Sequence, residues 1–303
     1  MSSDPGPVTV GVIGLGNIGG AIAANLVEDG MAVTVADTDL DRVAAITGAR
    51  AAASLGELAA GCEVTITALP APEVVEAVAD EWSAGAPVGS ILVDLSTNAP
   101  DGNRELAERL ARSGHHFVEA PLTGGASGAR ARSLVFMVGG EDEAVEKVLP
   151  LLDRLGRATF HLGPVGAGAT MKLINSLLAF TSTVSSLEGL SLAAAAGIDL
   201  RTAVDVVRTG GASNFFIDRV VDGLDLRDRP VQFALSLAAK DTRLIAELAA
   251  SNEIPAPIAA ALVEVLADAV NRGLGERDWS DLVVATEARS GKSLRLGPAD
   301  GKG

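Results

Sequence analysis

Residues 8–19 read Val-Thr-Val-Gly-Val-Ile-Gly-Leu-Gly-Asn-Ile-Gly, and this stretch decides the fold. Its first half, Val8–Ile13, is an apolar, mostly β-branched run, as expected for a strand buried on both faces. Three glycines follow at once, and after them comes a helical pattern whose apolar side ends near Gly30. A second apolar run, Ala32–Ala36, closes on Asp37. The order is therefore strand, helix, strand, which predicts a parallel sheet covered by helices.

The same alternation continues to about residue 163. Further strand candidates are Val64–Leu69, Ile91–Leu95, His116–Val118 and Leu134–Val138, with helical stretches between most of them. Parallel strands of this kind are joined by right-handed crossovers. We therefore predict an α/β Rossmann domain, a doubly wound parallel sheet, over residues 1–164.

The second half of the chain changes character, because strand patterns stop after about Gly163. A long helical stretch runs from Ala169 to Ala196, and Gly197 is expected to cap it. Shorter helical segments follow at 200–208, 213–222, 232–251, 255–272 and 278–289. We predict an all-α domain over residues 165–290, linked by the long helix, and a mobile tail over 291–303.

The glycine loop has the spacing of a dinucleotide-binding turn. Gly14 permits the tight turn, Gly16 lets the backbone approach a pyrophosphate, and Gly19 lets the helix pack on the strand. The free N–H groups at the start of that helix then face the phosphates. The residues expected to bind the cofactor are Gly14, Leu15, Gly16, Asn17, Ile18 and Gly19.

Asp37 bears on the choice between NAD and NADP. A carboxylate at the end of the second strand accepts hydrogen bonds from the ribose hydroxyls of NAD and repels the 2′-phosphate of NADP. The next arginine is Arg42, five positions on, and its long side chain could reach back. NAD is therefore the predicted cofactor, with NADP as the less favoured alternative.

Composition excludes several classes of function. The formal net charge of −15 argues against binding to nucleic acid or to anionic lipid. Cys62 is the single cysteine, and the adjacent pair His115 and His116 would point to opposite faces, so no metal site is predicted. The first residues lack the runs of a signal peptide, and no stretch is expected to span a bilayer, the Ala-rich run at 192–196 being too short. We expect a soluble, cytoplasmic protein.

Lys172 is the candidate acid/base. The chain contains no Tyr, which excludes the tyrosine-based mechanism of short-chain reductases. Lys172 lies three residues before Asn175 on the long predicted helix, so both project from one face. Apolar neighbours favour proton exchange by the lysine near neutral pH, and Asn175 could orient the lysine or a substrate hydroxyl. Taken alone, a lysine near the start of a helix is more often a solvated charge.

A second candidate is the loop Thr123, Gly124, Gly125. Two glycines after a hydroxyl residue expose backbone N–H groups that, with the hydroxyl, could hold a carboxylate. An ordinary loop is the alternative for this stretch by itself.

Together these motifs resemble the β-hydroxyacid dehydrogenases, which include 3-hydroxyisobutyrate dehydrogenase and tartronate semialdehyde reductase and are relatives of 6-phosphogluconate dehydrogenase. The resemblance extends from Val10 to about Arg289. Its motifs, in chain order, are residues 14–25, Leu69-Pro70, residues 94–97, residues 121–125, residues 163–175 and Lys240-Asp241.

The resemblance implies a role for each matching residue. Lys172 matches the catalytic lysine, and Asn175 its companion in substrate binding. The loop Thr123–Gly125 matches the segment that grips the substrate carboxylate. Contacts to the cofactor are implied for Leu69, Pro70, Thr97 and, across the cleft, Lys240. The implied activity is the NAD-dependent interconversion of a small anionic β-hydroxyacid and its semialdehyde by a homodimer or homotetramer, with the helical domain serving substrate binding and assembly.

Two alternatives share this fold. Imine reductases typically lack the lysine and prefer NADPH, so Lys172 and Asp37 argue against one. A non-catalytic NAD-binding assembly protein would typically lack the lysine or carry additional domains, and the sequence has neither feature.

The chain also departs from the family pattern at several positions. Glu119 stands where Asp is usual, Thr123 where Ser is usual, and Arg132-Ser133 where Gly-Thr is common. Arg132 could bind an anionic substrate, but we favour a structural role in a loop. The variable positions Ser213, Asn214, Phe215 and Phe233 leave the identity of the acid open.

Overall fold

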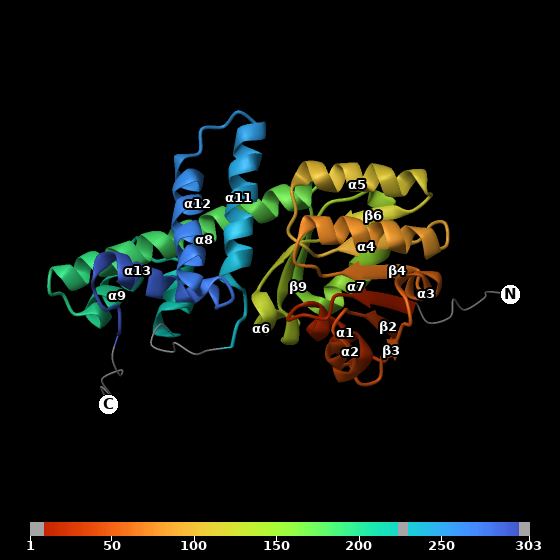
Figure 1. The fold of residues 1–303 in the computed structure, drawn as a ribbon, viewed down its shortest axis with the longest axis horizontal. Helices are drawn as coiled ribbons and strands as arrows, with labels where there is room; N and C mark the ends of the chain where they lie inside the picture. The colour runs from red at the N-terminus through yellow and green to blue at the C-terminus, as the bar shows by residue number, and fades with distance from the viewer. Residues whose placement is uncertain (1–8, 224–229, 297–303) are drawn as a thin grey trace. The chain divides into compact units, whose positions relative to one another are not determined.

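A six-stranded parallel sheet forms the centre of the first half of the chain (Figure 1). In sequence order its strands are β1 (Thr9–Ile13), β2 (Ala32–Ala36), β3 (Arg50–Ala51), β4 (Val64–Thr67), β5 (Ile91–Asp94) and β6 (His116–Glu119). In space the order is β3-β2-β1-β4-β5-β6. The chain therefore reverses direction across the sheet between β1 and β4, which is the point where open α/β sheets bind their ligands.

Alternate residues of the strands point to opposite faces of the sheet and belong to two separate hydrophobic cores, as expected for strands buried on both faces. Val10 and Val12 of β1 belong to the core on one face, and Leu92 of β5 belongs to the other. Trp82 of the second core is fully buried, and its indole N–H donates to Thr65 Oγ1 at 2.9 Å. The helices of this half are α1 (Gly19–Glu28), α2 (Leu40–Ala45), α3 (Leu55–Ala60), α4 (Pro72–Gly85), α5 (Pro100–Arg112), α6 (Gly125–Arg130) and α7 (Asp142–Leu155).

A small second sheet adjoins the end of β6. It consists of β7 (Leu122–Thr123), β8 (Leu134–Val138) and β9 (Gly156–His161), with β7 antiparallel and β9 parallel to β8. Glu119 and Gly139 exchange two backbone hydrogen bonds of 2.9 Å, which tie the two sheets together. The strands predicted from apolar runs are confirmed, whereas β3, β7 and β9 were not predicted.

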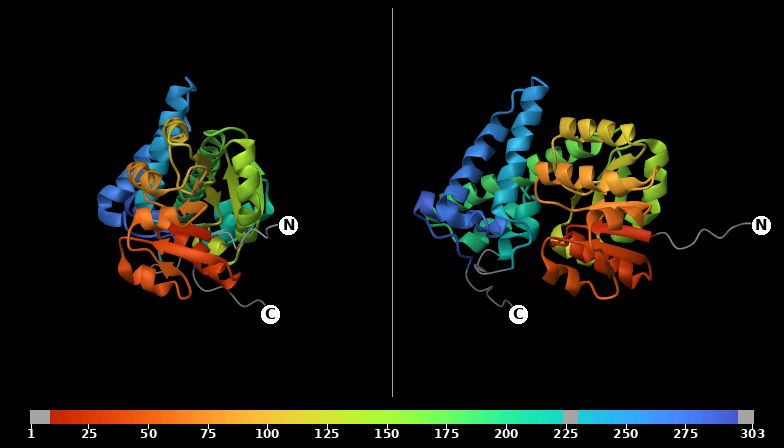
Figure 2. Two further views of the ribbon diagram at one scale, coloured as in Figure 1. Left: turned by 90° about the vertical axis from the view of Figure 1, so that its right-hand side faces the viewer. Right: turned by 45° about the vertical axis from the view of Figure 1, so that its right-hand side comes forward.

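The second half of the chain is helical, as predicted. Its elements are α8 (Ala167–Ala195), α9 (Leu200–Thr209), α10 (Phe215–Arg219), η1 (Val221–Gly223), α11 (Leu235–Ser251), α12 (Pro257–Ala269), η2 (Val270–Leu274), η3 (Trp279–Asp281) and α13 (Leu282–Ser290). Helices α11 and α12 pack side by side, as the views in Figure 2 agree. Within the described part of this half, strand pairing is limited to one isolated bridge, Ala234 with Asp278.

The chain divides into two compact units, Met1–Lys172 and Leu173–Gly303. The computed structural model describes residues 9–223 and 230–296. Of the tail expected to be mobile, residues 297–303 lie outside the described residues. In the part that is described, Leu294 is fully buried and its N–H donates to Glu287 Oε1 at 2.7 Å.

One expectation about membranes was wrong. Helix α8 has 29 residues and a mean hydropathy of 1.3 in its most apolar window, of which 22% is buried. By length and composition alone, it is therefore long and apolar enough to cross a bilayer. The prediction assigned the Ala-rich run to a longer amphipathic helix, but Leu, Ile, Phe and Met residues extend the apolar character along the whole helix. The finding is weak evidence for a membrane, since core helices of other proteins pass the same measure.

Candidate active site

The predicted cofactor residues of the first unit follow the carboxyl ends of neighbouring parallel strands. In the strand registers, Ile13 pairs with Ala36 and Thr67, Thr67 pairs with Asp94, and Asp94 pairs with Glu119. These five residues form one row across the sheet. The glycine loop and Asp37 come directly after members of this row, and Leu69 and Thr97 come two and three residues after others, so the fold brings them to one edge.

The glycine loop is closed too tightly for side chains at two of its positions. Gly14 has φ +86°, and a Cβ there would lie 2.5 Å from the carbonyl oxygen of Ala68. A Cβ on Gly19 would lie 1.8 Å from the carbonyl oxygen of Gly14. Around Gly16, by contrast, a Cβ would have no neighbour closer than 3.9 Å, an Arg42 guanidinium nitrogen. The loop thus leaves its backbone open at Gly16, as binding of a pyrophosphate requires.

Asp37 is fixed against this loop. Its Oδ2 accepts a 2.6 Å hydrogen bond from the Leu15 N–H, and its Oδ1 accepts one of 2.8 Å from the Asp39 N–H. The side chain of Arg42 turns back toward it, with 3.2 Å from Nε to Asp39 Oδ2 and 4.0 Å from Nη1 to Asp37 Oδ2. A carboxylate and a guanidinium therefore both stand beside the loop.

Lys172 contacts the residue that immediately precedes the loop predicted to hold a carboxylate. It lies in the second turn of α8, half-buried, and its Nζ donates to the carbonyl oxygen of Leu122 at 2.9 Å. Leu122 immediately precedes Thr123 in β7. Gly124 and Gly125 follow with φ of +123° and +63°, which side chains rarely adopt, and Gly125 opens α6. The lysine and the loop are thus neighbours within the first unit.

Two further predicted residues belong to the second unit. Asn175 is half-buried on α8, three residues after Lys172, so helix geometry places both on one side of that helix. Lys240 lies on α11 with its side chain 16% exposed, and its Nζ is 3.2 Å from Oδ1 of the buried Asp241.

A buried polar network lies beside the strand ends, and the sequence motifs did not reveal it. Asp94 Oδ1 accepts from the hydroxyls of Thr67 at 2.8 Å and Ser96 at 2.7 Å, and Ser96 Oγ accepts from the Leu69 N–H at 3.0 Å. Asp94 Oδ2 accepts from Asn98 Nδ2 at 2.7 Å. The network thus holds the segment after β4 against the segment after β5, both predicted to touch the cofactor.

The network continues through α5 to Glu119. Asn98 Nδ2 also donates to Asn103 Oδ1 at 3.1 Å, and Asn103 Nδ2 donates to Glu119 Oε2 at 2.6 Å. Helical spacing could have revealed Asn103, because it shares the buried stripe of α5 with Leu106 and Leu110. Burial raises the pKa of Glu119 above its usual range, while the hydrogen bonds from Asn103 and from backbone N–H groups oppose that shift.

The contacts of Arg132 support a structural role. Its guanidinium donates to Asp29 at 2.7 Å, to Glu28 at 2.9 Å and to the carbonyl oxygen of Asn25 at 3.1 Å, all in or next to the end of α1. Asn25 Nδ2 in turn donates to the carbonyl oxygen of Ala129 in α6, at 2.8 Å. Arg132 thus ties the turn after α6 to α1, as the loop interpretation supposed.

The described residues contain no cluster of three His, Cys, Asp or Glu side chains that could hold a metal ion.

The buried state of Asp94 predicts how stability depends on pH. Burial raises the pKa of Asp94 above its usual range, although the hydrogen bonds from Ser96, Thr67 and Asn98 act to lower that pKa. The native state therefore binds this proton more tightly than the unfolded state. The protonated Asp94 carboxyl contributes its full stabilisation below the pKa that this group has in the unfolded state. The contribution is lost as pH rises through the pKa that the group has in the native state. We expect the free energy of unfolding of the protein, minus that of Asp94→Asn, to fall as pH is raised from about 4.

Guanidinium denaturation followed by circular dichroism at several pH values measures this difference. Asp101→Asn, at the exposed start of α5, is the matched control and should give a much flatter difference. A difference for Asp94→Asn that rises with pH contradicts the assignment.

Comparison with known proteins places this arrangement in a family. Residues 9–163 match the model of the NAD-binding domain of 6-phosphogluconate dehydrogenase. Residues 166–286 match the model described as NAD-binding of NADP-dependent 3-hydroxyisobutyrate dehydrogenase.

Individual relatives agree with this result. The mitochondrial 3-hydroxyisobutyrate dehydrogenase of Drosophila melanogaster is 32% identical, over 92% of this chain and 90% of its own length. The NAD-dependent L-serine dehydrogenase of Pseudomonas aeruginosa is 31% identical, over 89% of this chain and 95% of its own.

Solved structures show the same fold. A Mycobacterium tuberculosis 3-hydroxyisobutyrate dehydrogenase with L-serine superposes with a TM-score of 0.84 at 26% identity, covering 92% of this chain and 98% of its own. An imine reductase from Myxococcus stipitatus gives a TM-score of 0.64 at 20% identity, covering 91% and 98%, which shows a shared fold alone. Two family models in chain order, with relatives matched over most of their length, show that the chain belongs to the β-hydroxyacid dehydrogenase family of NAD(P)-dependent oxidoreductases.

Proposed function

We propose that the protein interconverts a small β-hydroxyacid and its semialdehyde, with NAD as cofactor and Lys172 as acid/base. The observation that carries this proposal is the 2.9 Å contact between Lys172 and the strand leading into the Thr123–Gly125 loop. A proton-transferring side chain and a loop suited to a carboxylate are adjacent in one unit. Relatives act on substrates of this class, as the names 3-hydroxyisobutyrate dehydrogenase and L-serine dehydrogenase state.

The glycine loop fits the cofactor. Side chains are excluded at Gly14 and Gly19, the backbone at Gly16 is open, and the N-terminus of α1, which has the positive end of the helix dipole, follows the loop directly. When bound, the nicotinamide accepts or supplies the hydride. The residues proposed to hold the cofactor are Gly14, Leu15, Gly16, Asn17, Ile18, Gly19, Asp37, Leu69, Pro70, Thr97 and Lys240.

In the oxidation direction, neutral Lys172 removes the proton of the substrate hydroxyl, and in reduction its ammonium form returns that proton to the oxygen. Thr123 and the backbone of Gly124 and Gly125 hold the substrate carboxylate, which fixes the distance between the hydroxyl and the lysine. Asn175, one turn further along α8, orients the lysine or the substrate hydroxyl. Placement of the reacting atoms supplies much of the rate enhancement in such a site.

Removing the lysine tests the mechanism. We expect Lys172→Ala to lower kcat by about 10²–10⁴-fold, the contribution typical of general acid–base catalysis. The measurement is NAD reduction at 340 nm across a panel of hydroxyacids: 3-hydroxyisobutyrate, glycerate, 4-hydroxybutyrate, serine and sulfonated analogues.

Lys147→Ala, an exposed lysine of α7, is the matched control and should leave kcat unchanged. Near-normal turnover by Lys172→Ala would refute its role. A wild-type protein that binds NADH but reduces or oxidises nothing in the panel would favour a larger substrate or the non-catalytic alternative. Turnover of cyclic imines by the wild-type protein, faster than that of any hydroxyacid, would favour the imine reductase alternative.

Asp37 supports NAD as the preferred cofactor, since a carboxylate after the second strand accepts hydrogen bonds from ribose hydroxyls and repels the 2′-phosphate of NADP. We expect Asp37→Asn to shift the ratio of kcat/KM for NAD to that for NADP by about tenfold or more toward NADP, which corresponds to roughly 1.4 kcal/mol. Steady-state kinetics with both cofactors measure the ratio.

Arg42 provides the matched second variant. With the charge of Asp37 removed, Nη1 of Arg42 is available to a phosphate while Nε stays paired with Asp39, so Asp37→Asn/Arg42→Ala should lose most of the gain in NADP use. A wild-type protein that already prefers NADP would overturn the proposed preference.

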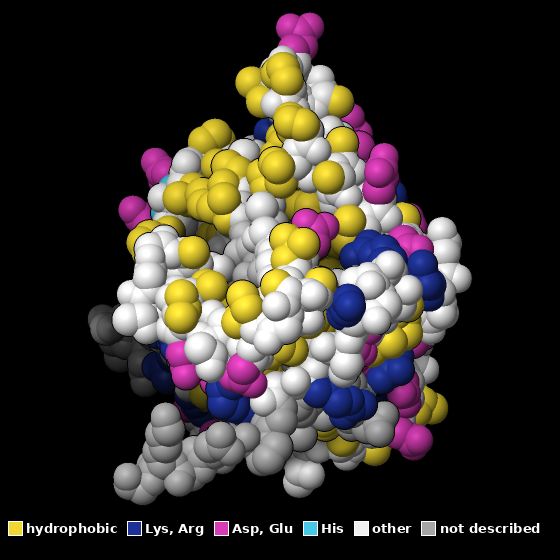
Figure 3. Space-filling view, turned by 90° about the vertical axis from the view of Figure 1, so that its left-hand side faces the viewer, with side chains coloured by type: hydrophobic (Ala, Val, Ile, Leu, Met, Phe, Trp, Pro, Cys, Tyr) yellow, Lys and Arg dark blue, Asp and Glu magenta, His cyan; other side chains and the backbone are white. Residues whose placement is uncertain are grey.

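We also propose that the protein is a homodimer or homotetramer. Helix α8 exposes apolar side chains along its length, including Leu178 at 65% and Leu192 at 72% exposure. Figure 3 shows apolar side chains at several places on the face that it displays. Exposed apolar surface of this kind marks an interaction site, and a second copy is the occupant that family membership suggests.

Light scattering after size exclusion tests the assembly. We expect a mass of at least twice the chain mass of 30.6 kDa, and Leu178→Glu/Leu192→Glu should shift the protein toward the monomer. Val88→Glu, at a position that is 83% exposed in the first unit, is the control. A monomeric wild-type protein that binds phospholipid vesicles would instead support a membrane as the cover of α8.

A further inference from the structure

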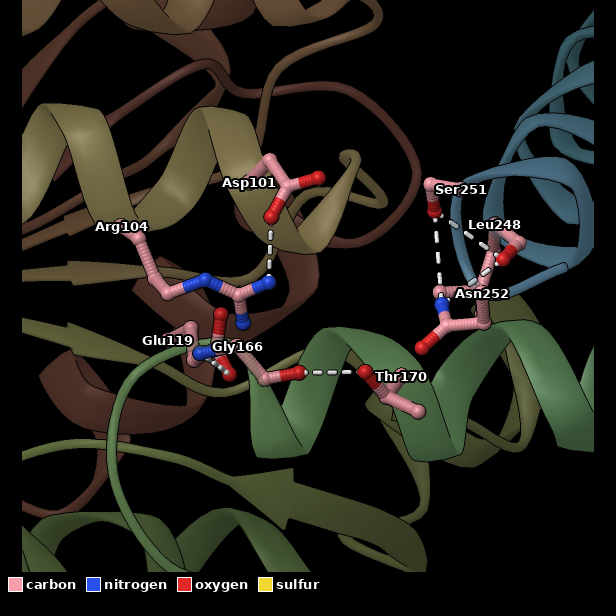
Figure 4. A network of polar contacts seen from close by, with 8 residues as sticks. All are labelled: Asp101, Arg104, Glu119, Gly166, Thr170, Leu248, Ser251 and Asn252. Carbon is pink, nitrogen blue, oxygen red and sulfur yellow. Dashed lines mark hydrogen bonds and ion pairs between the residues drawn. The ribbon is translucent and has the colours of Figure 1, made fainter.

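Glu119 binds the start of the helix that carries Lys172. Its side chain is fully buried at the end of β6, and one carboxylate oxygen, Oε1, accepts three backbone hydrogen bonds. The donors are the N–H groups of Gly166 at 2.7 Å, Gly168 at 2.8 Å and Ala169 at 3.1 Å. Figure 4 shows Glu119 beside Gly166, with the Thr170 hydroxyl donating to the Gly166 carbonyl at 2.7 Å.

The other oxygen of the same carboxylate faces the strand ends. Glu119 Oε2 accepts from Asn103 Nδ2 at 2.6 Å, and the hydrogen bonds continue through Asn98 to Asp94 and Ser96. Ser96 in turn accepts from the N–H of Leu69, a proposed cofactor residue. A continuous buried chain of hydrogen bonds thus joins the cofactor side of the sheet to the first turn of α8.

Two glycines bring the backbones close enough for this contact. A Cβ on Gly139 would lie 2.4 Å from Glu119 Oε1, and a Cβ on Gly168 would lie 2.3 Å from the carbonyl oxygen of Met137. The start of α8 therefore rests directly on β8, without side chains between them. Lys172 follows Ala169 by three residues, less than one helical turn, so its backbone has little freedom to move independently of the start of α8.

The carboxylates of Asp94 and Glu119 determine which group donates and which accepts in each hydrogen bond of this chain. The four partners of Glu119 named above are all donors, which fits the ionised carboxylate. The amides of Asn98 and Asn103 are oriented by acceptors at both ends of the chain, Asp94 and Glu119. A glutamine at position 119 could satisfy only one side. If its oxygen faced the N–H groups of α8, its NH₂ group would face Asn103 Nδ2, another donor. If its oxygen faced Asn103, the NH₂ group would face the N–H groups of α8.

We propose that Glu119 is a positioning residue, which sets the place of Lys172 relative to the cofactor edge through the start of α8. This inference rests on the proposed function for its kinetic readout. It differs from a simple helix cap, because a cap would require only the contacts of Oε1, whereas positioning requires the link through Asn103 as well.

Three variants separate positioning from capping. Glu119→Gln disturbs both oxygens, and Asn103→Ala removes only the link at Oε2 while the cap remains. The reciprocal exchange Glu119→Gln/Asn103→Asp restores complementarity, because the new amide donates to the new carboxylate. Asp80→Asn, which alters the exposed pair between Asp80 of α4 and Arg109 of α5, is the control.

We expect Glu119→Gln and Asn103→Ala each to lower kcat by about 10- to 100-fold, the loss typical of a misplaced catalytic group. NADH affinity, measured by fluorescence titration, should stay within about threefold, and the exchange variant should recover most of kcat. If Glu119→Gln does not fold, Asn103→Ala decides alone. A folded Asn103→Ala protein with wild-type kcat would overturn the proposal, as would an exchange variant no better than Glu119→Gln.

A second readout does not depend on turnover. The rate at which an acetylating reagent labels Lys172, relative to the exposed Lys147, is measured by peptide mass spectrometry. We expect it to rise about three- to tenfold in Glu119→Gln and Asn103→Ala, because the hydrogen bond to Leu122 is loosened. Unchanged labelling would refute the proposal, even if the wild-type protein oxidised no hydroxyacid and the proposed function had therefore failed.

Discussion

The first unit depends on one close approach of backbones, that of the Gly14 turn to Ala68 and to the start of α1. A Cβ at position 14 or 19 would fall within 2.5 Å or 1.8 Å of a carbonyl oxygen. Because the turn is held so closely, the ends of β1 and β4 and the first N–H groups of α1 have fixed relative positions. The sheet register then sets Asp37, Leu69 and Thr97 along the same edge.

The fold was largely predictable because its main strands are buried on both faces. Such strands appear in the sequence as continuous apolar runs, and the runs at β1, β2 and β4 match the structure within two residues at each end. Strand β9 was not predicted because Gly156–His161 mixes polar and apolar residues and is partly exposed. It shows neither a continuous apolar run nor a strict alternation of apolar and polar residues. The bounds of α8 were predicted within two residues, but the helix was expected to be amphipathic, whereas by length and composition it is apolar enough to cross a bilayer.

The candidate site was predictable where chemistry is local in sequence. A glycine spacing, a carboxylate at a strand end and a lysine with an asparagine at helical spacing each stand within a few residues. The hydrogen bonds of Glu119 could not be predicted in the same way, because they join residues 16 to 50 positions apart. Polar contacts between residues so far apart in the sequence depend on the register of β5 with β6 and on where the start of α8 packs, and no local sequence pattern contains either.

The division between the two units falls within a helix. Helix α8 runs unbroken from Ala167 to Ala195, while the units separate between Lys172 and Leu173. The backbone between the two units is therefore a continuous run of hydrogen-bonded helical turns. Lys172 and Asn175 stand on either side of the division, yet the helix keeps the spacing between them nearly constant. The proposed acid/base and its proposed companion are thus placed by a single helix, although each belongs to a different unit.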